Sequence, residues 1–278
     1  MSYFRPDALS AALACLAGGR HLVLAGGTDV YPAAVGRALE GPVLDITGIG
    51  EISGITRAGG EVRIGGTTTW AEIARAELPP AFDALKAAAG EVGGRQIQNA
   101  GTIGGNLCNA SPAADGVPPL LVLDAEVELV STAGLRRMPL AAFLTGPRRT
   151  ARRADEILTA VLVPEAAQVG RSAFVKLGAR RHLVISIAMV AARLEVADGV
   201  VRAAALAVGA CGPVATRLPA LEARLIGAAA IPGLAGLIDP AEVAAPLAPI
   251  DDLRARAAYR GEAAAELLRR VVAGLVAA

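Results

Sequence analysis

Short apolar runs alternate with glycine-rich turns through the first part of the chain. Runs that are continuous or alternate with polar residues predict strands, here at 21–25, 41–47, 52–57, 61–65, 126–132 and 154–166, the last ended by Pro164. Apolar residues at helical spacing predict helices at 29–39, from Trp70 onward, at 80–92 and at 117–125. This mixture of strands, helices and glycine turns is typical of the α+β class.

The pattern changes near residues 165–171. Three strands are predicted after this point, with turns at 179–181 and 198–199, and helical segments follow at 214–226, 240–245 and 251–275. Strands followed by helices predict a separate C-terminal domain, in which the helices cover one face of the sheet.

Composition excludes several classes of function. Apolar residues make up 54% of the 278 residues and charged residues 19%, and the formal net charge is +1. A packed core is therefore expected, with no bulk attraction to nucleic acid or to an anionic membrane. The N-terminus has no signal-peptide pattern, and the longest uncharged stretch, 225–238, is too short and too rich in Gly, Ala and Pro to span a bilayer. We expect a cytoplasmic protein.

Cysteine and histidine are scarce. The three cysteines, Cys15, Cys108 and Cys211, are far apart in the sequence, and the only histidines are His21 and His182. This spacing argues against a disulfide framework, a zinc site or an iron–sulfur cluster held by this chain alone, and against a Ser-His-Asp triad. We expect neither a metal site nor a catalytic acid or base here.

The first candidate motif is "LAGGTD", residues 24–29. A strand leads into two glycines, and a helix is predicted directly after them, beginning near Asp29. Backbone N–H groups can converge on a phosphate in such a turn. An ordinary strand-to-helix turn is the alternative, because short glycine motifs have many false positives.

The second candidate motif is "NAGTIGGNLCNASPAAD", residues 99–115. It has too many turn formers for a helix and too few β-branched residues for a strand, so the pattern predicts a polar loop. Thr102 and Asn106 add polar groups to its glycine pair, and Asp115 offers the acceptors that often hold ribose hydroxyls. A structural loop is the alternative. Together, however, the two motifs provide two glycine-rich loops for phosphates and one carboxylate for a ribose, which are the groups that bind a dinucleotide.

Other charged and aromatic residues give weaker signals. Lys176 lies mid-strand among apolar residues, where it must face solvent or an acceptor such as a carbonyl or phosphate. The four arginines of 146–153 are most simply a solvated loop. We expect Tyr3 and Phe4 to pack in the core and His182 to lie in a turn.

Together with "EILTAVLVP" (156–164) and "FVKLGARR" (174–181), these motifs resemble the FAD-binding medium subunits of molybdenum-containing hydroxylases, the xanthine dehydrogenase and carbon monoxide dehydrogenase family. The resemblance covers nearly the whole chain. It implies a vanillyl-alcohol-oxidase-type (PCMH-type) fold, in which two α+β subdomains (1–55 and 56–167) bind FAD between them. The C-terminal domain (168–278) would hold a three- to four-stranded antiparallel sheet and helices.

The resemblance also implies roles for individual residues. The first loop would bind the FAD pyrophosphate, the second loop would also embrace the phosphates, and Asp115 would lie near the FAD. Cys108 and Leu158 fall where apolar side chains lie against the isoalloxazine, Lys176 matches a lysine that contacts the flavin, and Val92 matches a position that is aromatic in some relatives. The full set is Val23, Leu24, Ala25, Gly26, Gly27, Thr28, Asp29, Val30, Val92, Thr102, Ile103, Gly104, Gly105, Asn106, Cys108, Asp115, Leu158 and Lys176.

Electron transfer is the activity that the resemblance implies. A large partner would hold molybdopterin and a small partner two [2Fe-2S] clusters, as a dimer of heterotrimers. This chain would pass electrons from those clusters to NAD+, a quinone or another acceptor. It lacks the cysteine-bearing insertion after Asp115 that some relatives carry, so we expect FAD alone. The alternatives are a stand-alone flavin oxidase or reductase of the same fold and an interaction subunit that has lost FAD.

Overall fold

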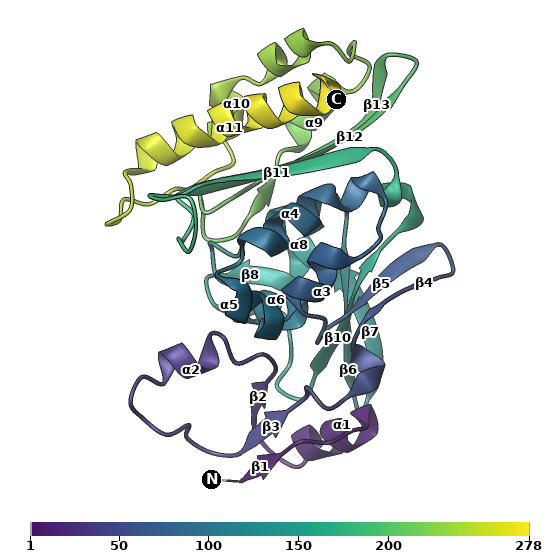
Figure 1. The fold of residues 1–278 in the computed structure, drawn as a ribbon, viewed down its shortest axis with the longest axis vertical. Helices are drawn as coiled ribbons and strands as arrows, with labels where there is room; N and C mark the ends of the chain where they lie inside the picture. The colour runs from purple at the N-terminus through teal and green to yellow at the C-terminus, as the bar shows by residue number, and fades with distance from the viewer. Residues whose placement is uncertain (1, 278) are drawn as a thin grey trace.

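A small parallel sheet lies at the N-terminal end of the computed structural model, which describes residues 2–277 (Figure 1). Its strands are ordered β1-β3-β2. The buried side chains of Leu44 and Ile46 pack with α1 and with Ile157 of the next sheet. The elements are β1 (Tyr3–Phe4), α1 (Leu9–Ala17), β2 (Leu22–Leu24), α2 (Val30–Ala33) and β3 (Val43–Asp45).

A five-stranded antiparallel sheet in the order β4-β5-β10-β6-β7 forms the middle of the molecule. Every residue of β10 is buried, as expected for the continuous apolar run of a central strand. Helices pack on this sheet through a buried cluster that includes Ile64, Trp70, Phe82 and Leu107. The strands are β4 (Ile55–Ala58), β5 (Glu61–Gly65), β6 (Glu126–Ser131), β7 (Gly134–Pro139) and β10 (Ile157–Val163), with the short pair β8 (Leu144–Gly146) and β9 (Arg149–Thr150) beside them. The helices are α3 (Trp70–Arg75), α4 (Asp83–Glu91), α5 (Arg95–Ala100), α6 (Ile103–Asn109), α7 (Val117–Val122) and α8 (Leu140–Phe143).

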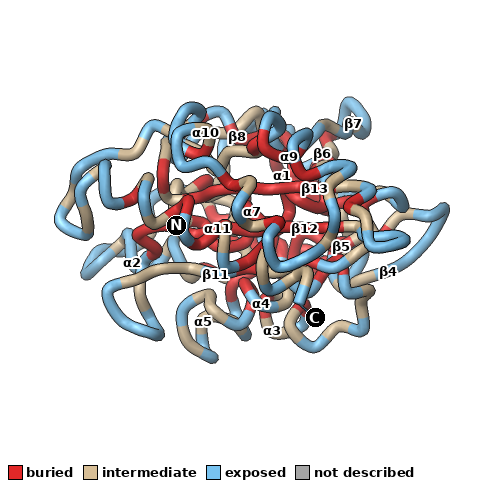
Figure 2. The backbone as a smooth tube through the Cα atoms, turned by 90° about the horizontal axis from the view of Figure 1, so that it is seen from above, coloured by how far each residue is buried: buried red, intermediate tan, exposed pale blue. Residues whose placement is uncertain are grey.

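The C-terminal part is a four-stranded antiparallel sheet, β11-β12-β13-β14. Helices α9 and α11 pack on one face, and α4 and α7 of the preceding part pack on the other. The helices of the C-terminal part therefore cover one face, as predicted, and the preceding part of the chain covers the other. The sheet is sandwiched, which explains why β12 is buried from Ala188 through Leu194 and why the buried backbone runs through the centre of Figure 2. The elements are β11 (Arg171–Leu177), β12 (Ala188–Ala197), β13 (Val200–Gly209), β14 (Thr216–Arg217), α9 (Pro219–Leu225), α10 (Pro240–Ala244) and α11 (Ala257–Ala277).

Local predictions fail at both glycine motifs. The helix predicted at 29–39 ends at Ala33, since Gly36 turns into the left-handed region at φ +71°. The polar loop predicted at 99–115 contains helix α6, because the Thr102 hydroxyl accepts a hydrogen bond from the Gly105 N–H at 3.0 Å and caps it. Burial of Ile103 and Leu107 then holds α6 in the central core.

Two further findings concern the surface of the protein. Tyr3 and Phe4 were expected in the core, but they are 57% and 44% exposed because β1 is an edge strand of the small sheet. No helix within residues 2–277 is both long and apolar enough to cross a membrane.

Candidate functional site

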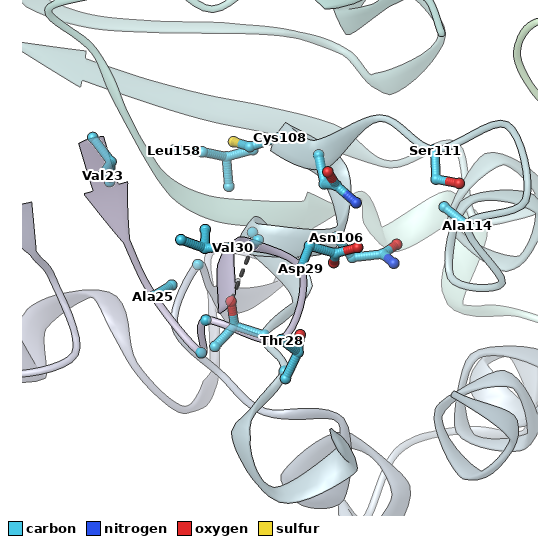
Figure 3. A pocket seen from close by; sticks show the side chains of 18 of the residues that line it. Val23, Ala25, Thr28, Asp29, Val30, Asn106, Cys108, Ser111, Ala114 and Leu158 are labelled. Carbon is cyan, nitrogen blue, oxygen red and sulfur yellow. Dashed lines mark hydrogen bonds between the residues drawn. The ribbon is translucent and has the colours of Figure 1, made fainter. Parts of the chain in front are cut away.

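A cavity of about 1200 Å³ opens between the N-terminal sheet and the central part of the chain. It exceeds the usual range of about 300–1000 Å³ for small-molecule sites, so it has room for a ligand of dinucleotide size. Both glycine motifs line it, although their sequences lie about seventy residues apart. Figure 3 labels Asp29 of the first motif and Asn106 of the second among the side chains that line this space.

Glycine allows each motif to approach a neighbouring segment of backbone closely, and at Gly26 that neighbour is the other motif. A Cβ on Gly26 would lie 1.8 Å from the carbonyl oxygen of Ala100, and one on Gly104 would lie 2.5 Å from the carbonyl oxygen of Gly66. Gly27 also adopts φ +70°, a conformation that costs glycine little. The close approach of the backbones therefore excludes any other residue at positions 26 and 104 without a shift of the main chain.

The first motif presents free backbone donors. Within residues 2–277, the N–H groups of Gly26, Gly27, Thr28 and Asp29 meet no protein acceptor. Successive unpaired N–H groups that line a cavity form a site for an anion such as a phosphate. The motif therefore has the donors that a pyrophosphate requires.

The second motif is different, because its backbone donors are already used. The N–H of Ile103 donates to Thr68, that of Gly104 to Gly66, and that of Asn106 to Thr102. What this motif offers a ligand is the bare surface of two glycines and the Asn106 side chain. The Oδ1 atom of Asn106 is buried and has no hydrogen-bond partner in the part of the chain that is described.

Apolar side chains form one end of the cavity. Val23, Ala25, Cys108 and Leu158 lie together there, while Ser111 and Ala114 lie toward the other end (Figure 3). Burial raises the pKa of the Cys108 thiol to about 11, so at neutral pH it is an uncharged, nearly apolar wall. This end suits a planar heteroaromatic ring.

Val92 lies on the wall of the cavity, near the segment 183–185 that also lines it. Leu24 and Ile103, which belong to the two motifs, do not line the cavity; they are 4% and 0% exposed and pack in the core. Val30, Thr102 and Gly105, which belong to the predicted set of cofactor-binding residues, do line the cavity.

Asp115, which lines the cavity, forms a buried ion pair with Lys176, which does not line it. The Lys176 Nζ donates to Asp115 Oδ2 at 2.7 Å and also to the carbonyls of Glu91 and Val184, at 3.4 and 3.2 Å. The Ser186 hydroxyl donates to Asp115 Oδ1 at 2.7 Å. Burial raises the pKa of the Asp115 carboxyl, and the bonds from Lys176 and Ser186 act against that rise. In this arrangement the three ammonium protons all point to protein acceptors, and Asp115 joins the central part to the C-terminal part.

Five charged residues of the cavity wall were missed from the sequence. They are Arg20, Glu40, Arg148, Arg152 and Glu156. Burial tends to raise the pKa of Glu156, but two bonds from Arg136, at 2.6 and 2.8 Å, and one from the Arg153 N–H outweigh it, so this pKa is lowered. The only signal for Arg148 and Arg152 was the arginine-rich segment 146–153, which lines the cavity and also faces solvent at Arg148.

Comparisons with known proteins agree with this geometry. A family model described as the FAD binding domain in molybdopterin dehydrogenase matches residues 1–166, and one described as the CO dehydrogenase flavoprotein C-terminal domain matches residues 173–275. The chain belongs to the FAD-binding medium subunits of the molybdenum hydroxylase family. FAD is therefore the cofactor that its family holds, as the resemblance implied.

Individual members of the family are similar over most of their length. A putative xanthine dehydrogenase FAD-binding subunit of Escherichia coli K12 is 36% identical over 225 residues, which cover 78% of this chain and 76% of that protein. The carbon monoxide dehydrogenase medium chain of Afipia carboxidovorans is 31% identical, covering 97% of this chain and 94% of its own. The crystal structure of a Cu,Mo-CO dehydrogenase superposes with a TM-score of 0.91 at 28% identity, covering 100% of this chain and 98% of the other. The predicted fold class is thus confirmed.

Proposed function

We propose that this medium subunit is an electron-transfer subunit that binds one FAD in the cavity between its two glycine motifs. When bound, FAD supplies a ring system that can take up and release electrons. The subunit would receive electrons from [2Fe-2S] clusters of a partner chain and deliver them to NAD+, a quinone or another acceptor. The observation that carries the proposal is the row of free N–H groups from Gly26 to Asp29, facing the second motif across one cavity.

The residues of the cavity fit the parts of this cofactor. The Gly26–Asp29 backbone would hold the pyrophosphate, and Gly104 and Gly105 would let the ligand lie close to helix α6. The unpaired Asn106 oxygen accepts a hydrogen bond, which a hydroxyl or amino group of the ligand can donate. Cys108, Leu158 and Val92 would contact the ring systems, and Asp115 with Lys176 would fix the wall beside them.

The partner chains belong to the proposal as well. Molybdopterin and the iron–sulfur clusters would be held by a large and a small subunit, in a dimer of heterotrimers in the cytoplasm. Relatives named as medium chains of carbon monoxide dehydrogenase support a subunit role. We retain the division into 1–55, 56–167 and 168–278 as part of this proposal, with the cavity between the first two parts.

The FAD site is tested by replacing Gly26. We expect the purified chain to take up one FAD, and Gly26→Ala to lower the affinity at least about tenfold, which corresponds to about 1.4 kcal/mol. The reason is that the added Cβ forces the two motifs apart. Titration of the apo chain with FAD, followed by flavin absorbance and fluorescence, measures this.

Gly90→Ala is the matched control. Gly90 lies in helix α4, and a Cβ there meets nothing within 4 Å. This variant should bind FAD normally and gain up to about 1 kcal/mol of stability, since alanine is the better helix former. A wild-type chain that takes up no FAD would overturn the proposed cofactor site.

The subunit role is tested by co-expression with the neighbouring reading frames. We expect a stable complex that contains a molybdopterin chain and a chain with two four-cysteine sets. Recovery of this chain alone, with substrate oxidation of its own, would favour the stand-alone oxidase.

A further inference from the structure

Cys15 and His21 form a side-chain pair that the proposed function does not use. Cys15 lies on α1, and His21 directly precedes β2. The Cys15 Sγ lies 3.3 Å from His21 Nε2, while His21 Nδ1 lies 3.0 Å from the Gly19 carbonyl oxygen. Because a carbonyl can only accept, the neutral ring carries its hydrogen on Nδ1, and Nε2 is left to accept the thiol proton.

This arrangement has the three parts of an activated nucleophile. Cys15 is the nucleophile, His21 is the base, and the Gly19 carbonyl orients the base. His21 follows the C-terminus of α1 after a short turn, which brings its ring beside the thiol near the end of that helix.

The other two cysteines have no such environment. Burial raises the pKa of Cys108 and of Cys211 to about 11 in each case. Cys15 is partly exposed, and the exposed Arg20 precedes its histidine partner in sequence. Reactive thiols are those that are accessible and lie beside a cation or a base. Of the three cysteines, only Cys15 combines exposure with a base.

We propose that Cys15 is a modification site, a thiol activated by His21 that reacts with soft electrophiles and with hydrogen peroxide. In the peroxide reaction the Cys15 proton passes to His21 Nε2, and the sulfur attacks one peroxide oxygen. The S–O bond forms as the O–O bond breaks, and the departing hydroxide takes the proton from the imidazolium to give water. The sulfur is oxidised by two electrons to a sulfenic acid, and the peroxide is reduced.

The location gives this chemistry a consequence. His21 lines the cavity wall, and the strand that it precedes leads directly to the free N–H groups of Gly26 to Asp29. A group added to Cys15 displaces the imidazole from its thiol partner and so alters the wall beside the proposed FAD site.

The test follows each cysteine separately. The FAD-loaded full chain is treated with iodoacetamide, and modified peptides are measured by mass spectrometry over time. Cys15 should be alkylated at least about tenfold faster than Cys108 or Cys211. His21→Gln should slow Cys15 at least about tenfold, because glutamine can hydrogen-bond but cannot take the proton. A parallel reaction with hydrogen peroxide and dimedone should label Cys15 first.

His182→Gln is the control, because it removes the other histidine, which lies in a turn with no cysteine bonded to it. It should leave the Cys15 rate unchanged. Circular dichroism confirms that each variant is folded. Equal rates at Cys15 and Cys211, or an unchanged Cys15 rate in folded His21→Gln, would overturn the proposal. Since the readout is the mass of cysteine peptides, loss of FAD binding would not produce either result.

Discussion

At the scale of single residues, Asp115 and Lys176 show how a residue with a strong motif signal can take an additional role in the structure. They lie 61 positions apart and form an ion pair whose side chains are only 10% and 7% exposed. The motif indicated Asp115 as a ribose acceptor, and the family resemblance implied that Lys176 contacts the flavin. In the structure the two side chains form an ion pair with each other. A structural ion pair and a cofactor ligand predict different effects when either residue is replaced.

We predict that Asp115→Ala lowers the free energy of unfolding by about 3–5 kcal/mol, because it leaves the Lys176 ammonium buried without a counter-charge. Lys176→Met should cost a similar amount, and the double variant should lose much less than the sum of the two. Urea denaturation of all four proteins measures this cycle. If Asp115→Ala keeps its stability and loses only FAD affinity, the carboxylate binds the cofactor and its ion pair with Lys176 does not stabilise the fold.

At the scale of elements, the sequence predicted the helices and strands that have regular local patterns and missed those that depend on tertiary packing. The strand that Pro164 ends, the strands β4 and β5, and the start of α3 at Trp70 follow the sequence, because each depends on local residues such as the Thr69–Glu72 cap of α3. Helix α6 was missed, since its glycines are poor helix formers and tertiary burial of Ile103 and Leu107 holds it.

The site was predictable to the same extent. The two glycine motifs identified the segments that meet at the cavity, because only glycine fits where the backbone approaches another segment this closely. Arg148 and Arg152 gave no such signal, since an arginine-rich loop looks the same whether it faces solvent or a cavity. The pairing of Cys15 with His21 depends on how α1 packs beside β2, which no local pattern encodes.

A pH dependence is expected at the start of α11. Asp252 accepts bonds from the N–H groups of Arg254 and Ala255 and from the side chain of Arg260, and these hold its pKa at about 2, below the ordinary 3.8. Since the folded pKa is the lower one, the stabilisation is complete above about pH 4 and is lost as the pH falls toward 2.

We therefore predict that Asp252→Asn lowers the melting temperature at pH 7, and that the difference from wild type shrinks as the pH falls below about 4. Melting curves between pH 7 and pH 3 measure this. Asp198→Asn, which removes an 88% exposed carboxylate, is the control and should show little difference at any pH. If the difference in melting temperature between wild type and Asp252→Asn stays constant below pH 4, the charge of Asp252 does not contribute to stability.

At the scale of the whole molecule, the C-terminal sheet is joined to the rest by a shared core. Phe174, Met189 and Ala207 belong to the same buried cluster as the helices of the central part. The Ser172 hydroxyl adds a polar link, donating to the Ala81 carbonyl at 2.7 Å and accepting from the Ala84 N–H at 2.8 Å. The cavity wall at 183–185 belongs to the C-terminal part, so its position depends on this interface.

Arg193 is a charged residue that bonds across this interface. Its guanidinium, on the buried part of β12, donates to the carbonyls of Val122 and Val169 at 2.8 and 3.2 Å and lies 3.4 Å from a carboxylate oxygen of Asp124. Burial lowers the pKa of Arg193, which shows how much this cation relies on those acceptors. We predict that Arg193→Ala lowers the free energy of unfolding by about 3–5 kcal/mol, since it leaves two carbonyls unpaired and a cavity in the interface.

Arg202→Ala provides the comparison, because Arg202 makes an exposed ion pair with Asp198 four residues earlier on the same sheet. Its loss should cost no more than about 0.5 kcal/mol. Urea denaturation followed by both Trp70 fluorescence and far-ultraviolet circular dichroism measures the two variants. Coincident curves for wild type indicate one cooperative unit, as the shared core requires. If Arg193→Ala shifts only the circular dichroism curve, the C-terminal part unfolds by itself and the interface does not couple it to the cavity.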